Sequence, residues 1–284
     1  MKKPQWILAG IGLSLVILLF VFGRFTPEKD NSLQKNAAPA ATEIPISFTV
    51  DTALADAKKT LAGNLISEAN LLEQTLQQAK DSASQLAANH SLAHFWQEKA
   101  QIFEPFAWYE AEAARLENSE KSLTFAARLF LDNLQEDSDG PRRQWKALQA
   151  KELYERSLKI NPANDSARVG IGACYLFGNI STNPMEGIAL IREIVAKDST
   201  NAYAQLTLVK GTILSGQYEK GIARLQTVIR THPENIEATL LLADLYERTG
   251  DKPNAIKWYE KSALRVQQSE IRQAIRDRIK ELKK

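Results

Sequence analysis

The sequence predicts an all-α solenoid, in which pairs of helices stack one on another. Two stretches near the C-terminus match at a constant offset of 34 residues. The matching pairs are Asn201 and Asn235, Ala204 and Ala238, Leu208 and Leu242, Gly216 and Gly250, and Leu225 and Tyr259. Such a period is typical of repeated units that stack because none can bury its apolar face alone. With 284 residues, 44% of them hydrophobic, the chain is also too long for one compact core but normal for a stack.

Each of the last two units reads as a helix, a tight turn and a second helix. The turn falls at Gly216 in the unit over residues 201–235 and at Gly250 in the unit over residues 236–268. We expect Gly250 to adopt the positive φ that ends a helix in a tight turn, because glycine has no Cβ to oppose it.

The same pattern continues upstream with insertions. Residues 164–200 form a unit with three extra residues, which fall in the loop at 178–184. Residues 119–163 form an earlier unit, in which the polar segment 135–143 reads as an expanded loop. Four successive units are therefore expected over residues 119–268.

These repeated positions resemble the tetratricopeptide repeat (TPR) family. Small residues stand where the two helices of that repeat touch, as at Gly221 and Ala255, and a proline follows the second helix, as at Pro162 and Pro233. The resemblance covers about residues 119–269. It implies a right-handed superhelical solenoid of about four repeats, whose first helices line a concave groove that binds a protein or peptide partner.

The family register also implies which residues form the floor of this groove. They are Val169, Ala173, Phe177, Tyr203, Leu206, Lys210, Ile213, Leu214, Leu240, Asp244, Glu247 and Arg248. Some family members hold a C-terminal carboxylate with a lysine and asparagine clamp. Here only Lys210 could serve, because Ala173 and Asp244 stand at the equivalent places. An extended or helical peptide with apolar anchors is therefore the expected ligand.

The predicted groove can be tested by substitution, and one alternative to an open groove remains. We expect Tyr203→Ala and Leu206→Glu to weaken partner binding while leaving the melting temperature almost unchanged. The alternative is that the N-terminal helices fill part of this face, since a buried apolar face and a ligand-binding one look alike in sequence.

Residues 269–284 read as a capping helix that closes the stack. Ser269 is the expected N-cap, and an apolar stripe follows at Ile271, Ile275, Ile279 and Leu282. The opposite face carries Arg272, Arg276, Lys280 and Lys283. We interpret that face as solvated rather than as a docking surface, because cations are favoured near a helix C-terminus.

The N-terminal end of the sequence predicts a membrane anchor. Residues 1–4 are a short basic tail, and residues 5–25 contain an uncharged run from Trp6 to Phe22 that reads as a transmembrane signal anchor. The alternative is a cleavable signal peptide. Residues 26–50 are rich in alanine and proline and read as a flexible tether. The basic head favours a single-pass protein of the bacterial inner membrane with its repeats in the periplasm.

Residues 51–118 form an N-terminal helical region that could be a degenerate repeat. Its apolar residues are spaced almost as a heptad: Leu61, Leu65, Ala69, Leu72, Leu76, Ala79, Ala83 and Leu86. A break is expected at Gly63-Asn64. A helical hairpin packed on the repeats is the favoured interpretation, because alanine is too small at several positions of a coiled-coil seam. Self-association through this stripe is the alternative.

No constellation of residues predicts catalysis. His90, His94 and Glu98 share a helix face, but Ser91 stands where a zinc protease motif needs glutamate. Gly170 and Gly172 are explained by the repeat register rather than by a dinucleotide site, and Cys174 has no base within a helical turn. The formal net charge of +2 gives no electrostatic footprint for nucleic acid. We expect no catalytic residue, metal or cofactor.

These observations predict a membrane-tethered scaffold for protein interactions. Its partner is a protein or peptide, and residues 5–25 contact lipid. The layout resembles that of bacterial single-span TPR proteins that assist cytochrome c maturation or the Sec translocon, which implies a role in envelope protein assembly, maturation or translocation. The alternative is a self-associating structural membrane protein in which the repeats serve as a spacer.

Overall fold

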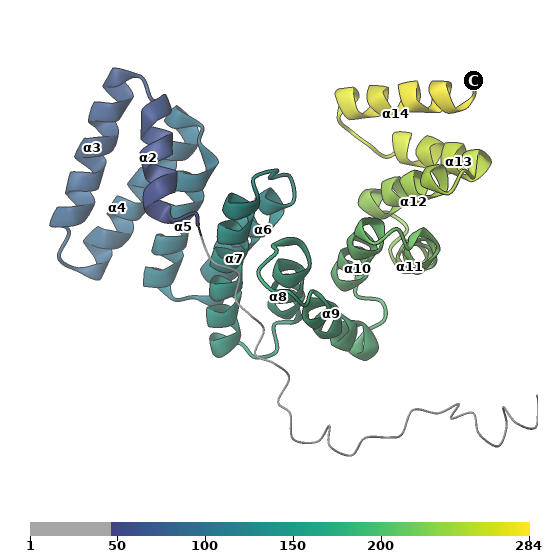
Figure 1. The fold of residues 1–284 in the computed structure, drawn as a ribbon, viewed down its shortest axis with the longest axis horizontal. Helices are drawn as coiled ribbons and strands as arrows, with labels where there is room; N and C mark the ends of the chain where they lie inside the picture. Colours follow the sequence, from purple (N-terminus) through teal and green to yellow (C-terminus); the bar gives the residue numbers. More distant parts are fainter. Residues whose placement is uncertain (1–46) are drawn as a thin grey trace, which may run out of the picture. The chain divides into compact units, whose positions relative to one another are not determined.

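The structure is a computed structural model that describes residues 47–284, and this part of the chain contains α-helices, one π-helical turn and no strand (Figure 1). The N-terminal helices are α2 (Val50–Thr60), α3 (Gly63–Gln78), α4 (Ser82–His94), the π-helical turn η2 (Phe95–Ala100) and α5 (Phe103–Glu117). The repeat helices are α6 (Glu120–Leu134), α7 (Gly140–Ile160), α8 (Asp165–Phe177), α9 (Met185–Lys197), α10 (Ala202–Leu214), α11 (Tyr218–Thr231), α12 (Ile236–Arg248) and α13 (Lys252–Ala263). The last helix is α14 (Ser269–Leu282).

Helices α6 to α13 pack as four pairs, which we number as the first to fourth repeats. Within each repeat the two helices contact one another, and the second helix of each repeat contacts the first helix of the next (Figure 1). The first helices of neighbouring repeats also touch in the first half of the stack, where α6 meets α8 and α8 meets α10. This arrangement is the all-helical solenoid that the 34-residue period predicts.

The turns inside the third and fourth repeats are equivalent, as predicted. Gly216 has φ of 69° and Gly250 has φ of 81°. The residue after each glycine closes the turn with the same backbone hydrogen bond, because Gln217 N donates to Thr212 O and Asp251 N donates to Tyr246 O. Glycine provides this left-handed conformation without the strain that a Cβ would cause.

Asparagine begins three successive repeats. The side chains of Asn164, Asn201 and Asn235 accept hydrogen bonds from the backbone N–H groups of Ala167, Ala204 and Ala238. Each asparagine therefore caps the first helix of its repeat and satisfies one of the N–H groups that has no partner inside the helix. The matching asparagines in the sequence are thus start signals for the helices.

Glycine in the second helices permits the close approach that the sequence predicts. A Cβ added at Gly221 would lie 2.6 Å from both Thr212 Oγ1 and Leu245 Cδ1. A Cβ at Gly187 would lie 2.3 Å from the carbonyl oxygen of Gly172. Because these distances are below van der Waals contact, α11 and α9 could not approach their neighbours as closely with a larger residue.

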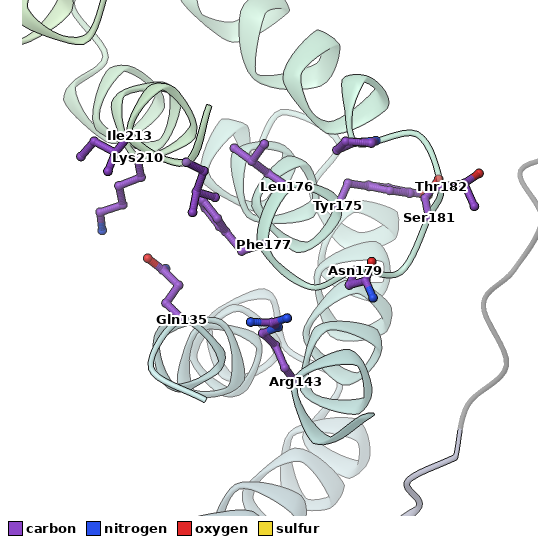
Figure 2. A pocket seen from close by; sticks show the side chains of 12 residues that line it. Gln135, Arg143, Tyr175, Leu176, Phe177, Asn179, Ser181, Thr182, Lys210 and Ile213 are labelled. Carbon is purple, nitrogen blue, oxygen red and sulfur yellow. The ribbon is translucent and has the colours of Figure 1, made fainter. Parts of the chain in front are cut away.

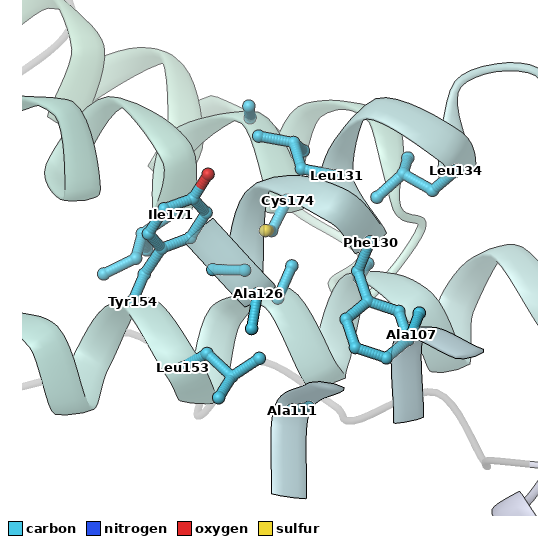
Figure 3. Close-up of a cluster of buried hydrophobic side chains, with 14 of the residues drawn as sticks. Ala107, Ala111, Ala126, Phe130, Leu131, Leu134, Leu153, Tyr154, Ile171 and Cys174 are labelled. Carbon is cyan, nitrogen blue, oxygen red and sulfur yellow. The ribbon is translucent and has the colours of Figure 1, made fainter. Parts of the chain in front are cut away.

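The largest cluster of buried apolar side chains lies around α6, α7 and α8 (Figure 3). Phe130 of α6 packs edge-on against Trp145 of α7, with ring centroids 5.5 Å apart. Phe48 packs against the other side of this assembly, with its ring 5.5 Å from that of Trp145. The end of the predicted tether, residues 47–50, is therefore anchored on the first repeat rather than flexible, and α2 begins at Val50.

The apolar stripe of the N-terminal region is divided between separate helices. Ala69 of α3 is fully buried, and Leu65, Leu72 and Leu76 pack around it against the cluster of α4, η2 and α5. A break at residues 79–81 separates α3 from α4, and Ala83 beyond it is exposed. The expected hairpin is present as α3 and α4, but it packs on η2 and α5 rather than on the repeats. A continuous coiled-coil seam over residues 61–86 is not formed.

Two local predictions differ from the structure. The polar segment 135–143 is not all loop, because Asp139 caps α7 and Pro141 stands in its first turn, so the helix starts at Gly140. Ser269 does not cap the last helix. It is the first residue of α14 and donates a hydrogen bond to Glu270, while Gln268 holds the cap position without a side-chain bond.

The predicted membrane anchor over residues 5–25 and most of the predicted tether lie outside the described residues. Within residues 47–284 no helix has both the length and the apolar character needed to cross a bilayer.

Candidate peptide-binding pocket

A cavity with a volume of about 840 Å³ opens between the first three repeats. We call it the inter-repeat pocket. Its apolar wall comes from the C-terminal ends of α8 and α10, and the polar side comes from α6, α7 and the loop before α9 (Figure 2). The lining residues are Gln135, Arg143, Tyr175, Leu176, Phe177, Asn179, Ser181, Thr182, Pro184, Lys210, Ile213 and Leu214. A cavity of this size, with both apolar and polar lining residues, suits a ligand larger than one side chain.

The apolar wall offers side chains that water can reach. Leu214 is 69% exposed at the end of α10, and Phe177 is half-buried at the end of α8. Helices α8 and α10 pack closely at Gly211, where an added Cβ would lie 2.9 Å from Leu176 Cδ2. The two repeats therefore present a shared apolar surface instead of two separate ones.

Three polar side chains reach into the same space beside Phe177 (Figure 2). They are Gln135 from the end of α6, Arg143 from the first turns of α7, and Lys210 from α10. Lys210 Nζ also lies 3.0 Å from Glu237 Oε1 of the fourth repeat. The pocket thus combines an apolar wall with two cations and an amide.

The loop that interrupts the second repeat forms one side of the pocket. Its conformation is fixed by its own hydrogen bonds, since Asn183 N donates to Ser181 Oγ and Met185 N donates to Asn183 Oδ1. Ile180 is buried in the core around α6 to α8, which holds the loop against the stack. The residues inserted into the repeat are therefore structured and available as a wall.

An ion-pair network holds the start of α7, from which Arg143 extends. The carboxylate of Asp137 accepts hydrogen bonds from Arg142 Nε, Arg142 Nη2 and Lys146 Nζ, each at 2.7 Å. Lys146 also lies 2.6 Å from Glu104 of α5. Burial alone would raise the pKa of the Asp137 carboxyl, but the bonds from Arg142 and Lys146 outweigh it and hold that pKa well below its usual range.

Some of the predicted groove residues line the pocket, whereas others are buried. Phe177, Lys210, Ile213 and Leu214 line the inter-repeat pocket together. Val169 is fully buried with α9 and Ala204, and Ala173 is also buried, so neither can line an open groove. These residues lie where the first helices of adjacent repeats pack on one another, and that packing removes them from solvent.

Leu206 belongs to the interior and corrects a second prediction, whereas Tyr203 is partly buried against the cluster of α8, α9 and α10. Leu206 is only 6% exposed, within the core of the third and fourth repeats. Tyr203 is bonded to Tyr154, and burial raises the pKa of its phenol to about 12. Leu206→Glu would place a charge in a packed core and lower the melting temperature, so this variant cannot report on partner binding alone.

The predicted groove residues of the fourth repeat are engaged within the chain. Leu240 packs with the apolar face of α14, and Glu247 accepts hydrogen bonds from Arg278 of α14 and from Tyr259. The bond from Arg278 holds the pKa of Glu247 below its usual value. Asp244 and Arg248 form an ion pair with each other at 2.7 Å. The four predicted residues are thus engaged by α14, by Tyr259 or by one another.

The predicted alternative, in which N-terminal helices fill the groove, does not apply to this pocket. Its lining residues all lie between Gln135 and Leu214, so none comes from α2 to α5. The sequence prediction missed Gln135 and Arg143, because they lie in a segment read as an expanded loop. It also missed the wall at residues 179–184, because an insertion has no counterpart in the family register.

Cys174 and the histidines of α4 lie outside the pocket. Cys174 is fully buried, and burial raises the pKa of its thiol. His90 lies 3.8 Å from Glu110 and 3.5 Å from Glu117, both on α5, while His94 lies on the surface of α4. Residues 47–284 contain no group of three or more histidine, cysteine, aspartate or glutamate residues arranged to hold a metal ion.

Comparison with known proteins identifies the repeat. Residues 215–274 match the family model described as tetratricopeptide repeat. A crystal structure of a tetratricopeptide repeat protein from Parabacteroides merdae ATCC 43184 superposes with a TM-score of 0.51 at 16% identity, covering 81% of this chain and 85% of that one. The superposition shows the fold of a helical repeat protein, and the family model identifies tetratricopeptide repeat sequence over residues 215–274.

Two further solved structures superpose with lower TM-scores. MamA (residues 41 to the end) from Desulfovibrio magneticus RS-1 has a TM-score of 0.41 at 20% identity, covering 66% of this chain and 96% of that one. YrrB, described as a TPR protein with an unusual peptide-binding site, has a TM-score of 0.40 at 11% identity, covering 74% and 99%. No curated protein matches the sequence significantly.

Proposed function

We propose that this protein is a membrane-tethered scaffold that binds a segment of a partner protein in the inter-repeat pocket. The observation that carries the proposal is the shared apolar surface of Phe177, Ile213 and Leu214, which two repeats present to solvent beside polar groups. Tetratricopeptide repeats are in general protein-interaction modules, and their stacked helices form extended binding surfaces. An extended peptide with apolar anchors fits this surface better than a small molecule does.

The predicted membrane anchor supports a location at the bacterial inner membrane with the repeats in the periplasm. The uncharged run from Trp6 to Phe22 has about the length that a bilayer requires, and a basic head precedes it. A scaffold held there would keep partner proteins near the membrane during envelope assembly, maturation or translocation. A C-terminal reporter enzyme that is active only outside the cytoplasm tests the orientation, and an inactive fusion of normal abundance would contradict it.

Photocrosslinking in cells tests the binding surface. A photoreactive amino acid at Thr182, which is exposed on the loop side of the pocket, should yield a discrete crosslinked partner that mass spectrometry identifies. Leu214→Glu should abolish this product, because it places a charge on the apolar wall. Leu264→Glu is the matched control, since Leu264 is 87% exposed and does not line the pocket.

Both leucines are exposed, so neither variant should change helicity or the melting temperature. Loss of the crosslink in Leu214→Glu alone supports binding in the pocket. An equal yield in both variants would show that the partner binds elsewhere, and no product from any position around the pocket would contradict the proposed function.

A further inference from the structure

Arg143 is a half-buried cation that has no partner of its own within residues 47–284. Its Nε is buried, and no hydrogen-bond acceptor lies within reach of it in this part of the chain. The side chain reaches into the inter-repeat pocket beside Phe177 (Figure 2). Removing this N–H group from water without a compensating acceptor is unfavourable, and a ligand that enters the pocket can supply the acceptor.

The neighbouring cations differ from Arg143 in this respect. Arg142 and Lys146 share the carboxylate of Asp137, and Lys151 of the same helix pairs with Glu155. Arg156 of this helix also pairs, with Glu152, whereas Arg143, which lines the pocket, has no ion pair within residues 47–284. Asp139 lies one helical turn before Arg143, but its carboxylate caps the N-terminus of α7 by accepting a hydrogen bond from the backbone N–H of Arg142.

Lys210 adds a second positive charge that can be shared. Its partner Glu237 is 51% exposed, and an ion pair with so exposed a carboxylate is weak and screened by salt. A carboxylate entering between Arg143 and Lys210 would thus meet two cations, with Gln135 as a further hydrogen-bond donor. Arginine favours this role because its planar group can donate two parallel bonds to one carboxylate.

We propose that the pocket recognises a partner segment in which an acidic side chain lies close to a large apolar one. The apolar residue packs on Phe177, Ile213 and Leu214, and the carboxylate binds the guanidinium of Arg143. This inference rests on the proposed function and adds the chemistry of the partner. It places the charge contact on the second helix of the first repeat, outside the groove floor that the family register gives.

An array of short synthetic peptides tests the proposal with the full-length protein in mild detergent. Each peptide carries one leucine or phenylalanine in a serine and glycine background, with glutamate, glutamine or lysine at varied distances from it. The glutamate peptide of the best spacing should bind about 10-fold or more tightly than its glutamine counterpart, because a charge-assisted bond is replaced by a neutral one. Replacing the apolar residue by alanine should abolish binding.

Two substitutions of Arg143 test whether this side chain causes the preference for glutamate over glutamine peptides. Arg143→Gln should remove the discrimination between glutamate and glutamine peptides, and Arg143→Glu should reverse it in favour of lysine peptides. Arg230→Gln is the matched control, because Arg230 is an exposed cation at the end of α11, remote from the pocket lining. It should bind all peptides as the unchanged protein does.

The results separate this inference from the proposed function. Peptide binding that depends on Leu214 but not on the acidic residue or on Arg143 would overturn the inference and leave the function intact. A loss of thermal stability in Arg143→Gln with unchanged peptide discrimination would overturn it as well, since Arg143 would then only complement the C-terminal end of α8. Failure of every peptide together with failure of the crosslink from Thr182 would reject both.

Discussion

Replacing Asp137 by asparagine should loosen the junction of α6 and α7, which forms the polar side of the pocket. Asp137 is 2% exposed in its side chain and accepts bonds from Arg142, Lys146 and the backbone N–H of Asp139. Asparagine has nearly the same shape but no charge, and its amide group would face a cation. Lys146, 3% exposed, would then keep only Glu104 as a charged partner.

The expected loss of folding free energy follows from the cost of removing one partner from a buried charge. Breaking a buried ion pair on one side typically costs about 3–5 kcal/mol. Because Glu104 and the amide oxygen of Asn133 remain bonded to Lys146, we expect the lower end, about 3 kcal/mol. Adding Lys146→Met to Asp137→Asn removes the unpaired charge, and it should recover most of this loss.

Hydrogen exchange followed by mass spectrometry is the suitable assay, because a repeat stack opens locally as well as globally. Peptides that cover the end of α6 and the start of α7 should exchange roughly 100-fold faster in Asp137→Asn, as 1.4 kcal/mol corresponds to a factor of ten. Asp132→Asn is the control, since its pair with Arg128 is more than half exposed and should contribute under about 0.5 kcal/mol. If both variants exchange at the same rate, the network does not hold this junction.

The pH dependence has a definite sign. The pKa of Asp137 is lower in the folded state than in the unfolded state, so the folded state binds fewer protons at this group. The stabilisation is therefore complete above the unfolded pKa of about 4 and declines as the pH falls below it. Protection of the α6–α7 junction should decrease below about pH 4, and it should do so less in Asp137→Asn, which has no carboxyl group to titrate.

Three further outcomes test the packing. Gly221→Ala should lower the free energy of unfolding by about 1–3 kcal/mol through overpacking, whereas Gly140→Ala, with open space around its Cβ position, should be neutral or stabilising in urea titrations. Cys174 should resist alkylation at pH 8 until the protein is denatured, because burial keeps its thiol protonated; rapid labelling of the native protein would contradict this. Leu206→Glu should lower the melting temperature strongly, and an effect no larger than that of Leu214→Glu would show that Leu206 is not core.

The fold could be predicted because its signals are local and repeated. Gly216 and Gly250 specify the same turn, and Asn201 and Asn235 specify the same helix start, so each unit independently supports the period. A single departure such as Ser269, which has a capping side chain but stands one residue too late, affects only its own helix.

The pocket could be predicted only in part, because exposure depends on neighbours that the register does not describe. Leu206 and Leu214 both stand at groove positions of the third repeat, yet one is buried and the other open. The difference lies in the packing of adjacent repeats. Phe177 and Lys210 were predicted because they lie on regular first helices, whereas Arg143 lies on an extension of α7 that has no equivalent in the other repeats.

These irregularities explain why an open pocket occurs among the first three repeats. The added turns of α7 bring Arg143 to the C-terminal ends of α8 and α10, and the loop at residues 178–184 adds a structured wall to the same pocket. The fourth repeat has neither feature, and its groove residues are instead engaged by α14, through Arg278 on Glu247 and through the apolar cluster that includes Leu240. The regular period thus builds the stack, while the departures from it build the pocket. Deleting the three inserted residues of the loop should therefore leave the solenoid folded and weaken binding of the glutamate peptide of the best spacing. Circular dichroism measures the first outcome and peptide titration the second.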